Sequence, residues 1–357
     1  MNVLCTGDLH IGRRPTRLPP HVDGRPLASA QAWQALVDYA LDQRVDLVAL
    51  SGDVVDRANR YFEAIGPLER GLRRLAAAGI ATVAVAGNHD HDVLPQLART
   101  VGSDAFRLLG RGGTWERTSI QARGGERLHV DGWSFPAEHV RDDPLAGYAL
   151  PPDPGVPTLG LLHADLDAPG SHYAPVSLRD LRSHPIAFWL LGHVHGPALH
   201  AGDGAAPVLY PGSPQPLHPG EPGVHGAWLL DLRAGCAPTV RQIPLATVRY
   251  ETVDIDVSDV TDAAELRQVV VERARREIGA RLRDAGPLRY LSARLRIVGR
   301  TPVHRHVARE LAAMAEDWEH EEGGVTAFVE RVDVETRAAR DLAALAGGSD
   351  AAAVLAR

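Results

Sequence analysis

The stretch Val45–Asp56 reads Val-Asp-Leu-Val-Ala-Leu-Ser-Gly-Asp-Val-Val-Asp, and it decides the fold expected for this chain. A short apolar run rich in Val and Leu is typical of a strand buried on both faces. A carboxylate, Asp53, follows the run at once. Two other apolar strands end alike: Asn2–Thr6 runs into Gly7-Asp8-Leu9-His10, and Ile80–Ala86 runs into Gly87-Asn88-His89-Asp90. Because open α/β sheets bind ligands beyond the carboxyl ends of their strands, these ends predict one polar site.

Composition places the chain among ordinary globular proteins. It has 357 residues, 45% hydrophobic and 23% charged, which suits one large domain and a smaller one. No apolar run approaches the roughly 18 residues that span a bilayer, and no signal segment precedes the first strand. With only two cysteines, Cys5 and Cys236, a cytoplasmic location is expected. The net charge of -7 counts against a nucleic-acid binder, although all 38 positive residues are arginine, which suits phosphate.

Strands and helices alternate along the first 245 residues, which we interpret as one domain. Helices are expected at Ala30–Gln43 and from Ile65 to the C′ residue Gly79. This order predicts βαβ units around a mostly parallel sheet, and so an α/β fold. Later apolar strands are expected as follows: Leu128–Phe135, Thr158–Leu162 ending on His163, Ile186–Leu191 ending on Gly192-His193-Val194-His195, Val208–Tyr210, and Ala227–Leu232 as the last of this domain.

A second, smaller α/β domain is expected over residues 250–346, and a frayed tail over 347–357. Its long helix is expected to be capped by Thr261 and stopped by Gly286-Pro287, with apolar residues at every fourth position. The other elements expected are the strands Thr252–Val257, Leu291–Ile297 and Val325–Val332 and the helices Val303–Trp318 and Glu335–Ala346.

Seven side chains at the strand ends have the types that bind metals. They are Asp8, His10, Asp53, Asn88, His163, His193 and His195. Each of these residues taken alone is more often a turn former or a surface residue, but seven of them at strand ends are not expected by chance. Carboxylate, imidazole and amide ligands suit manganese, iron or zinc, and seven exceed the needs of one ion. We therefore expect two ions about 3.5–4 Å apart, with Asp53 as the bridging carboxylate and a bridging hydroxide.

Further residues near these ends are candidates for catalysis and substrate binding. His89 is expected to donate a proton to the leaving oxygen or to face the transition state, with Asp90 orienting it. Asp56 is expected to have a structural role. Arginines on the loops beyond the first two strands could grip the phosphates that flank a scissile one: Arg13, Arg14, Arg17, Arg57 and Arg60.

These motifs resemble the five-part signature of calcineurin-like metallophosphoesterases. The signature comprises Asp8-x-His10, Gly52-Asp53-x-x-Asp56, Gly87-Asn88-His89-Asp90, His163 and Gly192-His193-x-His195. The resemblance implies a four-layer α/β/β/α sandwich. It also implies that Asp8, His10, Asp53 and His195 hold one ion, that Asp53, Asn88, His163 and His193 hold the other, and that His89 is the catalytic histidine.

Within that superfamily the chain looks most like bacterial SbcD-type DNA repair exonucleases. Gly7–Gly12, Trp189–His195, Tyr210-Pro-Gly-Ser213 and Gly220-Glu221 carry this likeness. It implies two Mn²⁺ ions, 3′-to-5′ exonuclease and single-strand endonuclease activity, and a DNA-capping role for the second domain. The partners implied are DNA, an SbcC-type ABC ATPase with a long coiled coil, and a second copy of the chain, with no membrane involved.

Two alternatives stay open at this stage. The first is a phosphodiesterase or phosphatase that acts on nucleotides or lipid precursors, and a closed pocket would favour it over an open groove. The second is a non-catalytic scaffold. Such scaffolds generally lose ligands, whereas this chain keeps the full set and His89.

Overall fold

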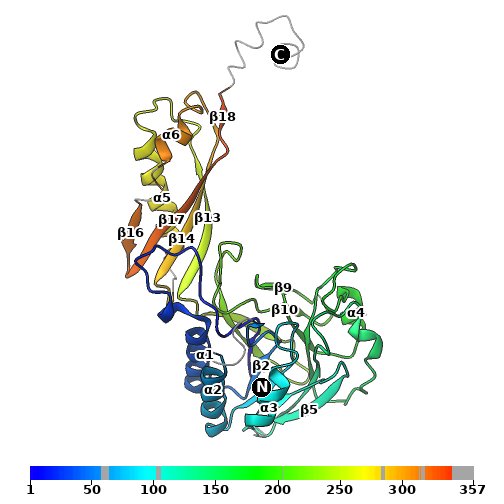
Figure 1. Ribbon diagram of the computed structural model, residues 1–357. Coiled ribbons are helices and arrows are strands. Elements are labelled where there is room, and N and C mark those ends of the chain that lie inside the picture. Colours follow the sequence, from blue (N-terminus) through cyan, green and yellow to red (C-terminus); the bar gives the residue numbers. More distant parts are fainter. Residues whose placement is uncertain are drawn as a thin grey trace, which may run out of the picture. The chain divides into compact units, whose positions relative to one another are not determined.

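The computed structural model contains two compact units (Figure 1). The structure describes residues 1–57, 64–101, 106–202, 204–282, 286–312, 314 and 318–339. The first unit comprises Met1–Thr16 and Pro20–Val248, and the second unit contains Arg17–Pro19 and begins again at Arg249. Among the described residues, no helix combines the length and the apolar character needed to cross a membrane.

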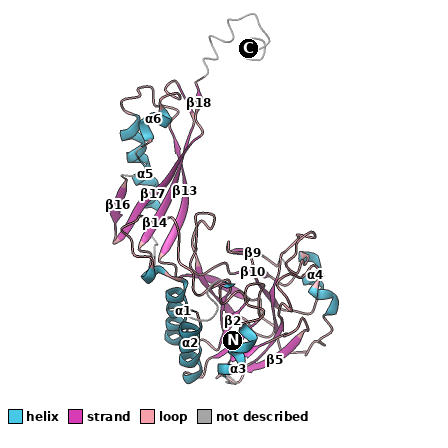
Figure 2. Cartoon of the chain, in the orientation of Figure 1, coloured by secondary structure: helices cyan, strands magenta, loops and turns pink. Residues whose placement is uncertain are grey.

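Two six-stranded sheets form the centre of the first unit (Figure 2). The first sheet has the order β12-β11-β1-β2-β3-β4. Its last four strands are parallel, whereas β11 pairs antiparallel with β1, and β12 pairs antiparallel with β11. Its strands are β1 (Asn2–Thr6), β2 (Leu47–Leu50), β3 (Ala81–Ala84), β4 (Phe106–Leu108), β11 (Gly226–Asp231) and β12 (Thr239–Pro244).

The second sheet has the order β5-β6-β7-β8-β10-β9, and its four central strands are parallel. Its strands are β5 (Glu116–Gln121), β6 (Arg127–Trp133), β7 (Thr158–His163), β8 (Phe188–Gly192), β9 (Ala198–His200) and β10 (Val208–Tyr210). The strands β5 and β9 form its antiparallel edges. The predicted mostly parallel arrangement therefore holds for the middle of both sheets.

Alternate residues of β1 show how the layers are built. Val3 and Cys5 pack between the two sheets, together with Leu159 and Leu161 of β7. Leu4 points the other way, into the core under the helices α1 (Ser29–Gln43), α2 (Ile65–Ala77) and α3 (Leu94–Val101). A strand that is covered on both faces needs the continuous apolar run seen in the sequence.

The outer face of the second sheet is covered more thinly. Trp189 and Leu191 of β8 pack with Leu181 of α4 (Leu178–Ser183) and with loop residues. A 3₁₀-helix, η3 (Pro144–Gly147), lies between β6 and β7, and another, η1 (Arg25–Leu27), precedes α1. The predicted α/β fold with two facing sheets between outer layers is confirmed, with a fourth layer made mostly of loops.

The prediction that Ala227–Leu232 is the last strand of this unit is wrong. The next strand, β12, pairs antiparallel with β11 along its whole length. Only Ile243 of its six residues is buried, because β12 is an edge strand whose side chains are largely solvated. Its sequence therefore lacks the apolar run by which the central strands were recognised.

The second unit has a four-stranded sheet in the order β13-β14-β17-β16. The strands are β13 (Val248–Asp256), which begins at the boundary, β14 (Tyr290–Val298), β16 (Glu319–Glu322) and β17 (Val325–Val334). The long helix α5 (Leu266–Leu282) buries Leu266, Val270, Ala274 and Ile278 against this sheet. The predicted spacing of every fourth residue is confirmed.

Three local predictions for the second unit are wrong. Thr261 does not cap α5, which begins at Leu266 after a turn in which Asp262 accepts from the backbone N–H of Ala264. The helix predicted over Val303–Trp318 begins late: residues 303–306 form turns, α6 spans Val307–Leu311, and Met314 is again helical. Instead of starting a closing helix, Arg337–Ala338 form β18, which pairs with β15 (Arg300–Thr301). Residues 340–357, including the expected tail, lie outside the described part of the chain.

Candidate metal centre

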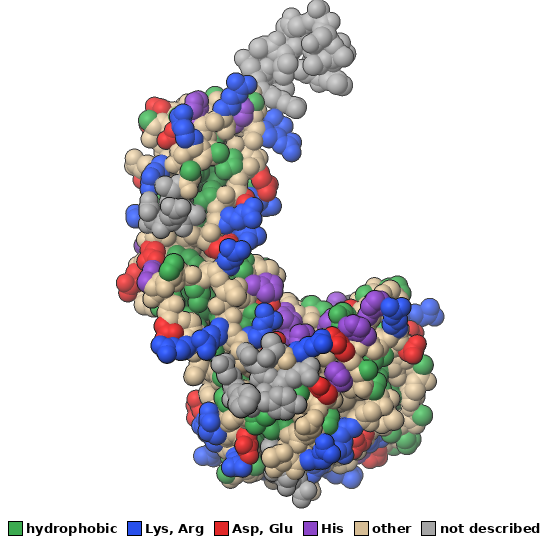
Figure 3. Space-filling view, viewed as in Figure 1, with side chains coloured by type: hydrophobic (Ala, Val, Ile, Leu, Met, Phe, Trp, Pro, Cys, Tyr) green, Lys and Arg blue, Asp and Glu red, His purple; other side chains and the backbone are tan. Residues whose placement is uncertain are grey.

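The seven candidate ligands all lie in the first unit, at or after the carboxyl ends of β1, β2, β3, β7 and β8. Asp8 and His10 follow β1, Asp53 follows β2, and Asn88 follows β3. Histidine side chains gather on one face of the first unit, among arginine and acidic side chains (Figure 3). The two sheets therefore deliver their polar ends to a common region, as expected for parallel strands.

The side chains form two groups that each have the spacing of a metal site. Possible ligand atoms of Asp8, His10 and His195 lie within 4.8 Å of one another, and so do those of Asp53, His163 and His193. In both groups the first two residues are buried or nearly so, whereas the last is partly exposed. Each group can thus hold one ion while remaining accessible from one side.

Asp53 belongs to the group of His163 and His193 and also faces the other group. Its Oδ2 is 3.4 Å from Nε2 of His163 in one group and 3.8 Å from Nε2 of His10 in the other. Asn88 lies beside the group that contains His163, with its Oδ1 3.0 Å from Nε2 of His163. This geometry is that of a carboxylate that two neighbouring ions can share.

The hydrogen bonds of two histidines show that the donor set fits cations. His195 places Nδ1 2.7 Å from Oε1 of Glu221, and His163 places Nδ1 3.0 Å from the carbonyl oxygen of Ser51. Both partners are acceptors, so each Nδ1 carries a proton, and Nε2 is the nitrogen that can bind an ion. Nε2 of His163 lies 3.0 Å from Oδ1 of Asn88, and Nε2 of His195 lies 3.1 Å from Nε2 of His10. Each pair is close enough to share one proton, and a divalent ion can take the place of that proton.

The electrostatics of the cluster also favour positive charge. Burial lowers the pKa of His163, but the negative charge and hydrogen bond of Asp53 outweigh it and raise the pKa to about 9. Burial raises the pKa of Asp53, but the charges of His163, His10 and His89 bring it below the usual carboxylate range. The buried carboxylate thus stabilises any cation at this position.

The backbone at the ligands is strained. Asp8, His10 and Asp53 have φ values of 49°, 43° and 49°, and His193 has φ of 99°. Non-glycine residues seldom adopt this region, and such conformations concentrate at functional sites. The glycine that precedes Asn88 avoids a steric clash, because a Cβ on Gly87 would lie 2.2 Å from Oδ1 of Asp53.

His89 belongs to neither of these two groups, but with His10 and Asp56 it forms a third group whose possible ligand atoms lie within 4.8 Å of one another. Its backbone N–H donates to Oδ1 of Asp53 at 2.9 Å, and its ring meets that of His10 edge-on, with centroids 4.8 Å apart. Nδ1 of His89 lies 3.9 Å from Oδ2 of Asp56, which is also 3.4 Å from Nδ1 of His10. Burial lowers the pKa of His89.

The structure contradicts the orienting role predicted for Asp90. Its Oδ2 accepts from the N–H of Val54 at 2.7 Å, and its Oδ1 accepts from the N–H of Gly87 at 2.8 Å. The side chain is fully buried, and burial and the charge of Asp53 raise its pKa to about 7. Asp90 therefore ties the β2 and β3 loops together, and the carboxylate that faces the His89 ring is that of Asp56.

The five candidate arginines lie in different parts of the chain's structure or outside its described residues. Arg13, Arg14 and Arg57 line a concave surface together with His89 and Asp56. Arg13 has its Nη1 3.7 Å from Oδ2 of Asp56, and Arg57 forms an ion pair with Glu138. Arg17 groups with the second unit, and Arg60 lies outside the described residues.

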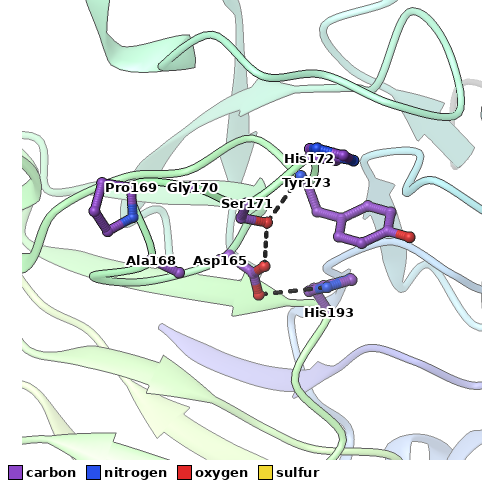
Figure 4. A pocket seen from close by; sticks show the side chains of 8 residues that line it. All are labelled: Asp165, Ala168, Pro169, Gly170, Ser171, His172, Tyr173 and His193. Atoms are coloured by element: carbon purple, nitrogen blue, oxygen red, sulfur yellow. Dashed lines mark hydrogen bonds and ion pairs between the residues drawn. The ribbon is translucent and has the colours of Figure 1, made fainter.

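Two carboxylates that support the histidines were missed. Glu221 contacts His195, and Asp165 has its Oδ1 3.3 Å from Nε2 of His193. Figure 4 shows Asp165 between His193 and the hydroxyl of Ser171, with Tyr173 beside the His193 ring. The sequence held a signal for Glu221 in the Gly220-Glu221 pair, but no role follows from the pair alone.

Comparison with known proteins identifies the class. A family model described as calcineurin-like phosphoesterase matches residues 1–197, more than half of the chain, and the chain belongs to this family. A second model, described as the middle domain of the metallophosphoesterase YhaO, matches residues 250–337.

Individual relatives are more distant. YhaO of Bacillus subtilis, named an uncharacterized metallophosphoesterase, is 27% identical over 237 residues, which cover 66% of this chain and 57% of YhaO. The DNA double-strand break repair protein Mre11 of Aeropyrum pernix is 27% identical over 267 residues, 72% of this chain and 64% of that protein. A dimetal phosphatase structure from Danio rerio aligns with a TM-score of 0.42 at 14% identity, covering 67% of this chain and 98% of that one. The chain thus spans less than two thirds of either curated relative.

Proposed function

We propose that the protein is a two-metal phosphodiesterase that cleaves DNA, a nuclease of the SbcD type. The observation that carries this proposal is the position of Asp53, whose Oδ2 faces a histidine of each ligand group. A single-ion site would not need a second group of ligands at this distance. The Mre11 relatives, which are named for DNA double-strand break repair, support DNA as the substrate.

The residues assigned to the two ions follow the two groups. Asp8, His10, Asp53 and His195 would hold one ion, and Asp53, Asn88, His163 and His193 would hold the other. Manganese is the proposed metal, since oxygen and imidazole ligands suit it. When bound, such ions acidify water and offset the charge of the phosphate.

The remaining residues act on the substrate. With Nδ1 of His89 directed at Asp56, Nε2 is left to face the substrate, where it can give a proton to the leaving oxygen. Asp56 orients that ring. Arg13, Arg14 and Arg57 line the concave surface beside His89 and can bind the phosphates that flank the scissile one.

A small-molecule phosphoesterase is the second candidate. The net charge of -7 favours it over a DNA-binding enzyme, and the family model that matches residues 250–337 is not named for DNA binding. If the protein is the proposed nuclease, its proposed partners are an SbcC-type ATPase and a second copy of the chain. Its proposed location is the cytoplasm.

One assay separates the candidates. The protein is incubated with Mn²⁺ and end-labelled duplex DNA, single-stranded DNA or bis-p-nitrophenyl phosphate, with His89→Asn as the matched control. A nuclease shortens the DNA in a manganese-dependent way, and His89→Asn does not. Hydrolysis of the aryl phosphodiester with intact DNA would favour the small-molecule enzyme, and no hydrolysis of any substrate would refute both.

A further inference from the structure

Glu221 is a buried carboxylate directly behind a candidate ligand. It is 3% exposed, and its Oε1 lies 2.7 Å from Nδ1 of His195 and 3.1 Å from Nε2 of His218, an exposed residue that is not a candidate ligand. Its Oε2 accepts from the backbone N–H of Leu217 at 2.7 Å and from the hydroxyl of Ser213 at 3.2 Å. Both oxygens are therefore held, and the carboxylate cannot rotate away from the imidazole.

The loop that carries Glu221 is fixed to the same histidine by its backbone. The N–H of Ser213 donates to the carbonyl oxygen of His195 at 3.0 Å. Gly212, with φ of 72°, allows this approach, because a Cβ there would lie 2.5 Å from that oxygen. The loop after β10 thus supports His195 through both backbone and side chain.

These contacts determine which nitrogen of His195 is free. Because Oε2 already receives two donors and Oε1 faces the ring, Nδ1 of His195 donates the hydrogen bond. This leaves Nε2 as the nitrogen that can bind an ion, and it lies 3.1 Å from Nε2 of His10, in the group that also contains Asp8. A carboxylate behind a ligating histidine typically changes metal affinity 10–100-fold.

We propose that Glu221 is the positioning residue for one of the two ions, acting only through His195. This rests on the proposed two-metal site but not on the identity of its substrate. The other ion has a different support, Asp165, which faces His193 from a partly exposed loop (Figure 4). The two half-sites should therefore respond separately to substitution of the two carboxylates.

The test measures Mn²⁺ binding, by calorimetry and by electron paramagnetic resonance of the full chain. Glu221→Gln should keep one tight Mn²⁺ position and weaken the other about 10–100-fold, because an amide cannot accept at both of its ends. Asp165→Asn, the matched control, should act additively with Glu221→Gln, since it affects the other half-site. Wild-type affinity at both positions in Glu221→Gln would overturn the proposal.

A double variant tests the route of the effect. If Glu221 acts through His195, Glu221→Gln combined with His195→Ala should bind Mn²⁺ as His195→Ala alone does. Additive losses would refute this route. Should Glu221→Gln melt below the working temperature, Ser213→Ala replaces it, with a smaller loss at the same position expected and unchanged affinity refuting the proposal. Normal Mn²⁺ binding without DNA cleavage would count against the nuclease alone.

Discussion

The two units differ in where their charged and polar side chains gather. In the first unit, besides cross-strand pairs such as Arg117 with Asp131, one set stands at the carboxyl ends of strands and converges from two sheets. In the second unit they lie along the strands and pair with opposite charges, as Arg296 of β14 does with Asp254 of β13 and Arg294 does with Glu330. All candidate metal-binding groups found among the described residues are in the first unit.

This difference shows where charged and polar side chains can remain in a fold without an oppositely charged partner. On a strand face, cross-strand neighbours are close enough to neutralise each charge. Beyond the end of a strand, the backbone leaves the sheet, and like groups from several strands can be held together. A cluster of possible ligand atoms favours a bound cation, and metal binding by the first unit can be tested.

The largest effect is expected for Asp53→Ala. It removes the carboxylate that faces both ligand groups, so it should abolish metal pairing and turnover together. Bound manganese is counted by elemental analysis, and activity is followed with bis-p-nitrophenyl phosphate. Two ions bound at normal occupancy in this variant would disprove the bridging role.

His89→Asn should have the next largest effect, with a different pattern. Neither proposed ion is assigned to the group that His89 forms with His10 and Asp56, so metal content should be unchanged. Loss of the proton donor should slow turnover by about 10²–10⁴-fold. Near-normal hydrolysis of the aryl phosphodiester would remove His89 from the mechanism, although that substrate has a good leaving group, so a DNA substrate is measured beside it.

Gly87→Ala should have a smaller effect without removing any ligand. The new Cβ would lie 2.2 Å from Oδ1 of Asp53 and 2.8 Å from the His163 ring. The displacement should weaken Mn²⁺ binding by about 10–100-fold, the range seen when the support of a ligand is disturbed. Gly147→Ala is the control because a Cβ there has nothing within 4 Å, and neither Gly147 nor Gly87 has a positive φ. Equal metal affinity in both variants would contradict the close approach described for Gly87.

Much of this centre could be predicted because it is built on strand ends. Asp8, Asp53 and Asn88 follow short apolar runs, and such runs locate strands without further information. The partners of the ligands could not be predicted in this way. Asp56, Asp165 and Glu221 sit on loops, and whether a loop carboxylate faces an imidazole or a backbone amide depends on packing between distant segments.

The wrong assignments have a similar origin. Asp90 follows His89 directly, but neighbouring side chains point apart, and its oxygens accept from amides of two different loops. In the second unit, helical periodicity gave no sign that Arg337–Ala338 would pair with Arg300–Thr301. The acidic strand β16 was missed because it gains its order by pairing with β17, not from apolar residues of its own.

The smallest effect is expected in the second unit, for Asp254→Asn. The carboxylate accepts from Arg296 at 2.7 and 2.6 Å, but the two side chains are 49% and 43% exposed. Water and salt screen such a pair, so its loss should leave the urea midpoint almost unchanged, and less changed at high salt than at low salt. Manganese affinity and turnover should stay at wild-type values, because no candidate ligand lies in this unit among the described residues. A clear loss of metal binding would mean that the charges of the two units act together, and the contrast between strand ends and strand faces would no longer explain where the chemistry lies.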